Sequence, residues 1–275
     1  MREIQDMTLN VARGLERLDK KLQEREKRFE HEFERISAPE RTYGIRITAV
    51  PVGDDLRLQR IFQSQNRLVK EIVPPTFTVK RQIPGRDVQP VDGTSDLPQR
   101  IRDLGWTPKL RAARTRSRYE HLPPINMDLY DYIELHCDGL VEFGLVSVIT
   151  DAKTRPICAD PAVWALAYAI YWADALRRCA GVGQVEYAVQ IAVHVKSEKV
   201  LVVRGSPQNA PDPWRIEDVA GKLERGLTTM PKYALSEVSE AGAILSTFER
   251  DLCNAGGKGY PDDVLGEFEV TSEHR

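Results

Sequence analysis

The sequence predicts an α+β protein: a long N-terminal helix, then a mainly antiparallel sheet packed on a central buried helix, with further helices near the C-terminus. Three observations predict this class. The first 36 residues carry apolar side chains at helical spacing, several later stretches alternate apolar and polar residues, and an almost wholly apolar segment follows Pro161. The order helix, strands, helix, strands, helices is that of an α+β arrangement.

The composition allows a substantial core and excludes some classes of protein. Hydrophobic residues make up 41% of the 275 residues, and the four cysteines form no C-x-x-C pair, which suits reduced thiols. The chain has neither an apolar leader region nor a run of 18 apolar residues, so we expect a cytoplasmic protein that contacts no membrane. With 39 basic and 41 acidic side chains, attraction to phosphate must come from local segregation of charge.

Residues 1–38 are expected to form a long amphipathic helix that ends near Ser37 and Pro39. A narrow apolar stripe on an otherwise charged helix is typical of a helix that packs on another surface. The helix is therefore either a connecting helix that docks on the protein's own body or a partner, or a dimeric coiled coil that makes a homo-oligomer. The candidate interface residues are Val11, Leu15, Leu18, Leu22 and Phe29.

Residues 39–256 are expected to form one α+β globular domain. The stretch 43–49 alternates as a half-buried strand, residues 54–105 suggest short or edge strands with long loops, and residues 128–149 read as two strands joined at Asp138-Gly139. Asp160 is a candidate N-cap of the apolar helix, which should end at Gly181.

The C-terminal part should contain a hairpin and two amphipathic segments. Residues 185–193 and the KVLVVR stretch are expected to pair around a turn at Ser197-Glu198. Amphipathic helical segments are expected at 216–227 and 235–253. Residues 257–275, rich in glycine, proline and acids, are expected to form a flexible acidic tail.

The most basic window of the chain is PKLRAARTRSRY at 108–119 with the residues just before it. If residues 110–118 form a strand, every second arginine projects from one face about 7 Å from the next, which matches successive phosphates of a nucleic-acid strand. The planar guanidinium can also grip a phosphate in two places. The candidate nucleic-acid-binding residues are Lys109, Arg111, Arg114, Arg116 and Arg118.

Two interpretations of this window stay open. Trp106 and Tyr119 flank it and could stack on bases, which favours a nucleic-acid surface. Alternatively, the arginines form the outer face of a sheet and pair with acids such as Glu134 and Glu142 on neighbouring strands.

The residues that could support metal chemistry are few. Asp138, Asp151 and Lys153 have the outline of a metal-dependent nuclease site, although the last two also suit an ordinary turn after a strand. The five histidines show no H-x-x-x-H spacing, and no nucleophile or phosphate-loop motif is present. We therefore expect no metal, no cofactor and no catalytic residue.

Three segments together carry a resemblance: MREIQDMTL at the start, YGIRITAVPVGDDLRL after the long helix and FERDLCNAGG near the end, with LRAAR and YIELHCDGLVEF between them. The chain resembles the C-terminal half of bacterial proteins that begin with an Alba-like, Schlafen-related DNA-binding domain. In that family the DNA-binding domain precedes the long helix, so the resemblance transfers no binding residue. It implies an accessory half that works with a separate or missing Alba-like domain, joined through residues 1–36.

The function expected from these observations is a noncatalytic accessory or regulatory module of a DNA-binding protein, for example in transcriptional regulation, that acts by contact with nucleic acid or with a protein. A metal-dependent nuclease and a structural homo-oligomer are the alternatives.

Overall fold

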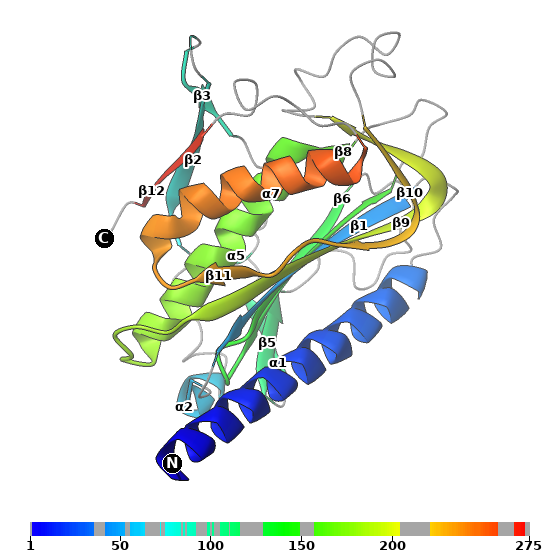
Figure 1. The fold of residues 1–275 in the computed structure, drawn as a ribbon. Helices are drawn as coiled ribbons and strands as arrows, with labels where there is room; N and C mark the ends of the chain where they lie inside the picture. The colour runs from blue at the N-terminus through cyan, green and yellow to red at the C-terminus, as the bar shows by residue number, and fades with distance from the viewer. Residues whose placement is uncertain are drawn as a thin grey trace, which may run out of the picture.

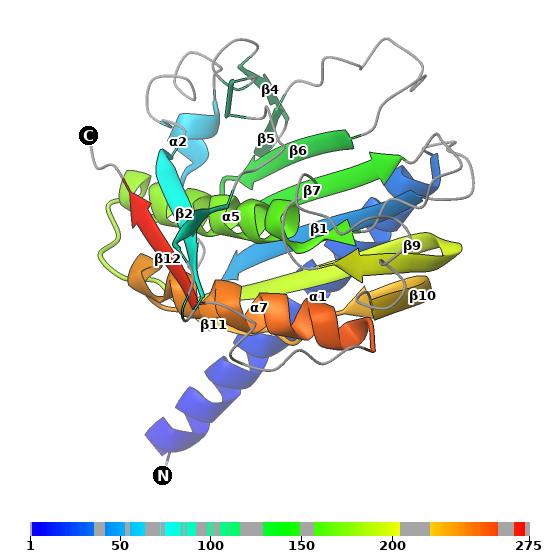
Figure 2. The ribbon, with the colours of Figure 1, turned by 90° about the horizontal axis from the view of Figure 1, so that it is seen from above.

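The structure is a computed structural model, and it describes residues 2–35, 42–52, 56–63, 72, 75–83, 85, 87–91, 98–99, 101, 105–109, 111–115, 129–148, 157–203, 221–257 and 267–272. These residues build three layers (Figures 1 and 2). Helix α1 (Arg2–Arg35) lies on one face of a large sheet, while α5 (Ala159–Cys179) and α7 (Ala241–Ala255) cover the other face. The α+β class and the leading helix are confirmed.

The described strands of the large sheet follow the order β10-β9-β1-β7-β6-β5-β4, and each neighbouring pair is antiparallel. Their bounds are β1 Thr42–Pro51, β4 Trp106–Pro108, β5 Ala112–Thr115, β6 Leu129–His136, β7 Val141–Val148, β9 Tyr187–Val203 and β10 Gly221–Thr229. Two short strands also pair with β9: β8 (Ile157–Cys158) in parallel and β11 (Tyr233–Leu235) antiparallel. The single turn α2 (Gln59–Phe62) lies between β1 and the second sheet in the sequence.

Strand β1 lies in the middle of the sheet and is buried on both faces. Ile45 and Ile47 belong to the main core, as their alternation predicts. Arg46 and Thr48, which we expected on a solvent face, are also fully buried. The prediction of a half-buried strand was wrong because α1 covers the polar face, and sequence alternation alone does not indicate which faces are covered.

The hairpin predicted at Asp138-Gly139 is confirmed. Strands β6 and β7 pair in register, and Gly139 adopts a φ of +93°, which a residue with a side chain rarely adopts. A Cβ on Gly139 would also lie 2.7 Å from Leu56 side-chain carbons. The turn therefore requires glycine on both counts.

The apolar helix is the central buried element, as predicted. Helix α5 runs from Ala159, so Asp160 lies in its first turn and not at the N-cap position, and Gly181 follows its end with a φ of +69°. The rings of Trp164, Tyr168 and Phe143 meet beneath it, with Phe143 contributed by β7. Such apolar burial is the main source of stability on this side of the sheet.

Two predictions for the C-terminal part were wrong. Residues 187–203 form the single strand β9, without a hairpin at Ser197-Glu198, and its partner is β10, whose residues 221–227 we expected to be helical. A register shift between Glu224 and Gly226, where φ is +125°, disguises the alternation of β10. Strand β9 pairs with β1 on one edge and with β10 on the other, and this pairing overrides the local turn signal.

The expected flexible tail at 257–275 contains an ordered strand. Strand β12 (Glu267–Ser272) pairs with β2 (Phe77–Gln82), which pairs in turn with β3 (Gln89–Pro90) to form a second, smaller sheet. The predicted helical segment 235–253 contains the turn η2 (Val238–Glu240) followed by α7. Among the helices that the structure describes, none combines the length and apolar content needed to cross a lipid bilayer.

Candidate functional site

The predicted interface residues converge where α1 lies on the sheet. Leu18 and Leu22 pack on Val50, Leu140 and Ala188. Nearer the C-terminal end of the helix, a second small cluster forms with members Phe29, Phe33, Tyr132 and Val146. The stripe therefore docks on the protein's own body, while the side chains of Val11 and Leu15 lie outside the described residues.

Between these apolar contacts, Arg25 of α1 enters a buried ionic cluster. Its Nε and Nη2 atoms donate to the two carboxylate oxygens of Glu142 at 2.6 and 2.7 Å, and Nη2 also donates to Glu134 at 3.2 Å. Arg25 is 8% exposed, and both glutamates are almost fully buried. The two carboxylates raise the pKa of Arg25 although burial opposes this, so the charge is held in place by its partners.

Glu134 of β6 is the centre of this cluster. Arg28 of α1 donates to both of its oxygens at 2.8 Å, and His136 Nε2 lies 2.9 Å from Oε1. Burial alone would raise the pKa of Glu134, but the adjacent His136 ring and the positive charges of Arg25 and Arg28 outweigh it and hold that pKa well below its usual value. The carboxylate is therefore ionised and saturated with donors.

Arg114, the centre of the predicted nucleic-acid surface, belongs to the same interface. Its two terminal nitrogens donate to the two oxygens of Glu32 at 2.9 Å each, and its guanidinium lies 3.7 Å from the ring centre of Tyr132. Burial would raise the pKa of Glu32, but the hydrogen bond from Arg114 keeps it lowered. The Tyr132 hydroxyl in turn donates to Glu142 at 2.8 Å.

Arg46 of β1 ties the sheet to the backbone of α1. It is completely buried and donates to the Leu22 carbonyl at 3.2 Å and to the Gln190 side-chain oxygen at 3.2 Å. Burial lowers its pKa, and Glu142 and Glu26 offset this only in part. Its charge is thus less compensated than the charges of Arg25 and Arg28, whose pKa values are raised.

His194 of β9 lies in the same layer, under the aromatic rings of α1. Its ring centre is 5.0 Å from that of Phe29 and 5.8 Å from that of Phe33. Burial, with a smaller contribution from the charge of Arg46, lowers its pKa from 6.5 to about 4. A Cβ at Gly44 would lie within about 3.1 Å of both phenylalanine rings, so a glycine lets the helix approach β1 here.

We call this group the α1 interface cluster. It consists of Arg25, Arg28, Glu32, Arg46, Arg114, Tyr132, Glu134 and Glu142. Charges alternate across the boundary, because each side contributes both arginines and glutamates. The arrangement fixes the rotation and axial position of α1.

Of the other candidate nucleic-acid-binding residues, two are exposed and two lie outside the described residues. Lys109 has an exposed side chain whose Nζ lies 3.5 Å from Glu134, and Arg111 is exposed just before β5. Arg116 and Arg118 lie outside the described residues. Trp106 is 1% exposed and meets Trp172 edge to face at 5.4 Å, so it is a core residue and not a base-stacking platform.

Of the candidate nuclease residues, Asp138 lies in the described part of the chain. Asp138 pairs with Lys21 of α1 at 2.6 Å, and this contact lowers its pKa although burial opposes the change. Asp151 and Lys153 fall outside the described residues. Within those residues, no group of three or more histidine, cysteine, aspartate or glutamate side chains could hold a metal ion.

A second buried ionic group joins the small sheet to the helices. Arg81 of β2 contacts Asp160 of α5 at 2.6 Å and Glu249 of α7 at 2.5 Å, and its guanidinium lies 5.0 Å from the centre of the Phe268 ring. All three charged residues are 3% exposed or less. This group explains the role of Asp160, which holds the second sheet on α5.

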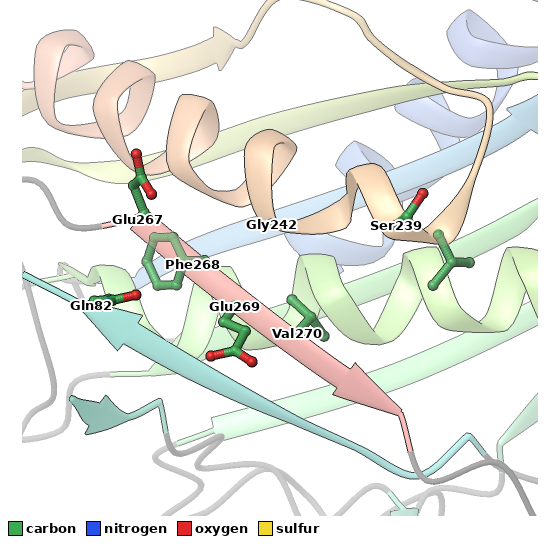
Figure 3. Close-up of a pocket in the computed structure, with 8 residues that line it drawn as sticks. Gln82, Ser239, Gly242, Glu267, Phe268, Glu269 and Val270 are labelled. Carbon is green, nitrogen blue, oxygen red and sulfur yellow. The ribbon is translucent and has the colours of Figure 1, made fainter.

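A pocket of about 280 Å³ opens beside β12 (Figure 3). Its walls come from the edge of β12, from the turn η2 and from the first turn of α7, with Ser239, Gly242, Phe268 and Val270 among the lining residues. The sequence did not predict this pocket, because one wall was expected to be part of an amphipathic helix at 235–253 and the other part of a flexible tail at 257–275.

Sequence reasoning also missed the α1 interface cluster, although a signal was present. Arg25 interrupts the apolar stripe of the first helix at a position where the period predicts a buried side chain. A charge at such a position needs a buried partner of opposite sign, and Glu134 and Glu142 were already candidates for pairing with arginines. The partners in the structure come mainly from α1 and not from β5.

No protein-family model, no curated protein and no solved structure matches this chain.

Proposed function

We propose that this protein is a noncatalytic accessory or regulatory module that acts through a protein partner bound to the N-terminal half of α1. The observation that supports this is the division of α1 into two parts. The part from Leu18 onwards packs on the sheet, whereas the N-terminal turns extend past the edge of the sheet (Figure 2).

The boundary between these parts is marked by an ion pair at the sheet edge. Asp19 contacts Lys232 at 2.5 Å, just before β11. From Leu18 back to Arg2 an α-helix spans about 24 Å. The arginine–glutamate pairs of the α1 interface cluster hold this extension at one angle to the body, because bidentate pairs restrict both rotation and sliding.

The sequence of the extension supports a partner there. Ile4, Val11 and Leu15 continue the apolar period of the stripe that packs on the sheet from Leu18 onwards. The resemblance of the chain suggests the class of partner, an Alba-like, Schlafen-related DNA-binding domain. The protein would then position that domain while making no base contact itself.

Direct nucleic-acid binding by the basic window has less support. Glu32 occupies both terminal nitrogens of Arg114, and Tyr132 covers the face of its guanidinium. A phosphate would have to displace α1 to reach this group. Lys109 and Arg111 remain exposed for such a contact, which leaves a smaller positive surface than the row of arginines that the sequence suggested.

Isothermal titration of the full chain with a purified Alba-like, Schlafen-related domain tests the proposal. We expect binding that a Val11→Asp, Leu15→Asp double variant weakens at least about tenfold, because charge in an apolar helix contact is costly. Gln23→Asp, an exposed position on the docked part of α1, should bind like the unchanged protein.

Two results would contradict this proposal and favour another function. Salt-dependent DNA or RNA binding that falls in a Lys109→Ala, Arg111→Ala variant, without binding of the Alba-like domain, would make the window the functional surface. A mass that doubles with concentration, and returns to the monomer value in the Val11, Leu15 double variant, would instead favour a structural homo-oligomer.

A further inference from the structure

Among the described strands, none pairs with the outer edge of β12 in the small sheet, and the hydrogen-bonding direction of that edge can be assigned. The Val79 carbonyl accepts from Val91 on the β3 side, so Val79 does not share its backbone groups with Val270, the residue opposite it on β12. Val270 therefore turns its N–H and C=O away from β2. Phe268, two residues earlier, points the same way, because its N–H donates to Ser246 Oγ of α7 at 3.2 Å.

Helix α7 covers only the first half of this edge. A Cβ at Gly242 would lie 2.2 Å from the Phe268 carbonyl oxygen, so helix and strand are in direct contact there. Beyond Phe268 the two elements diverge, and the pocket opens between Val270 and Ser239 (Figure 3). Within the part of the chain that the structure describes, no hydrogen bond is formed by the outward N–H and C=O of Val270.

The pocket beside this edge can accept one apolar side chain. Val238, Phe268 and Val270 give it an apolar side, Gln82, Ser239, Glu267 and Glu269 give it a polar side, and its volume is about 280 Å³. A strand added at the edge of β12 would turn alternate side chains toward this pocket, since side chains of a strand alternate between the two faces. The pocket thus sets a preference for an apolar residue at every second position.

Exposed acidic side chains around the pocket set a preference for charge. Glu267 and Glu269 are exposed on β12 beside the pocket, and Glu237 and Glu240 are exposed in the neighbouring turn. Lys80 is the base opposite Glu269 across the β2–β12 ladder. Among the described residues of this edge acids therefore outnumber bases, which favours a partner with basic residues at the positions between the apolar ones.

We propose that the edge of β12 binds an extended peptide in which apolar and basic residues alternate, by adding it as a strand beside Val270. The backbone of the peptide pairs with the outward N–H and C=O of Val270, one apolar side chain fills the pocket at Ser239, and its basic side chains lie beside Glu267 and Glu269. This site is separate from α1 and does not rest on the function proposed above.

The test is fluorescence anisotropy with a labelled, end-blocked peptide of alternating lysine and valine, titrated with the full chain. We expect saturable binding that is lost for a glutamate–valine peptide and for a lysine–valine peptide with methylated backbone nitrogens. Val270→Pro removes an N–H that points away from β2, so it spares the β2–β12 ladder and should weaken binding at least about tenfold. Ser239→Trp should do the same by filling the pocket.

The control for the bulky substitution is Thr247→Trp, at an exposed position of α7 away from the pocket, which should leave binding unchanged. Equal affinity of the unchanged protein and Ser239→Trp, or no binding of the lysine–valine peptide, would overturn the proposal. So would binding that appears only after residues 273–275 are deleted, which would assign the edge to the protein's own terminus. Self-association that Val270→Pro abolishes would assign it to a second copy and would also overturn the proposal.

Discussion

The two faces of the large sheet are both covered by helices, but different forces hold them. On the α5 face, side chains such as Leu166, Ile47 and Phe143 are completely buried in one continuous apolar core. On the α1 face, two small apolar clusters flank a buried network of arginines and glutamates. One face is held by apolar burial, and the other combines modest burial with directional ion pairs.

This difference means that one face mainly stabilises the fold and the other mainly positions α1. Apolar burial stabilises strongly and has little directional preference. Buried ion pairs add little net stability, because desolvation offsets most of their attraction, but they are strongly unfavourable when a partner is lost. The α5 face should therefore determine whether the protein folds, while the α1 face determines at which angle and register the long helix leaves the body.

The same substitution on both faces gives the largest effect and the most direct comparison. Leu166→Ala in α5 should lower the free energy of unfolding by about 4 kcal/mol, because the surrounding core is rigid and leaves a cavity. Leu22→Ala in α1 should cost about 2 kcal/mol, since its cluster is small and near the surface. Urea unfolding measures both values, and equal losses would contradict the division between the faces.

Removal of one charge from the α1 interface cluster should have the next largest effect. Arg25→Met leaves Glu142 buried without its arginine partner and removes one donor from Glu134, which should cost about 3 kcal/mol. Hydrogen exchange should show lost protection in α1 and unchanged protection in α5. Lys20→Met, on the exposed side of α1, is the control and should change neither helix. Loss of protection throughout the sheet would show that the network supports the whole fold.

A pH titration should give the smallest effect and is specific to the α1 face. His194 has a pKa of about 4 in the folded protein against 6.5 when unperturbed, so its contribution is complete above pH 6.5. As the pH falls from about 7 to about 5, the unfolded chain takes up a proton that the folded protein does not, and stability should fall by about 2 kcal/mol over this range.

Urea unfolding at about pH 7, about pH 6 and about pH 5 separates this effect from that of the carboxylates with lowered pKa, which act at lower pH. His194→Gln should flatten the pH dependence, whereas His31→Gln, at an exposed position of α1, should keep it. An unchanged slope in His194→Gln would mean that the ring is not held in its neutral form by the docked helix.

Local patterns in the sequence predicted much of the fold. The first helix, the hairpin at Asp138-Gly139 and the buried helix α5 each depend on periodicity, turn chemistry or apolar content within a short stretch. The predictions failed where pairing across the sheet decided the outcome. Strand β9 passes through a local turn signal at Ser197-Glu198, and β12 is ordered in an acidic segment because β2 provides its ladder.

The sequence by itself determined that α1 is amphipathic and that arginines gather around Arg114, because these properties belong to residues close together in the chain. Only the tertiary structure decided that the polar side of β1 is buried and that Arg114 pairs with Glu32. It also decided that Arg25 pairs with Glu142, which is 117 residues away in the sequence. The physical reason is that the state of a charge depends on which groups of opposite sign and how much solvent surround it, and distant segments supply both.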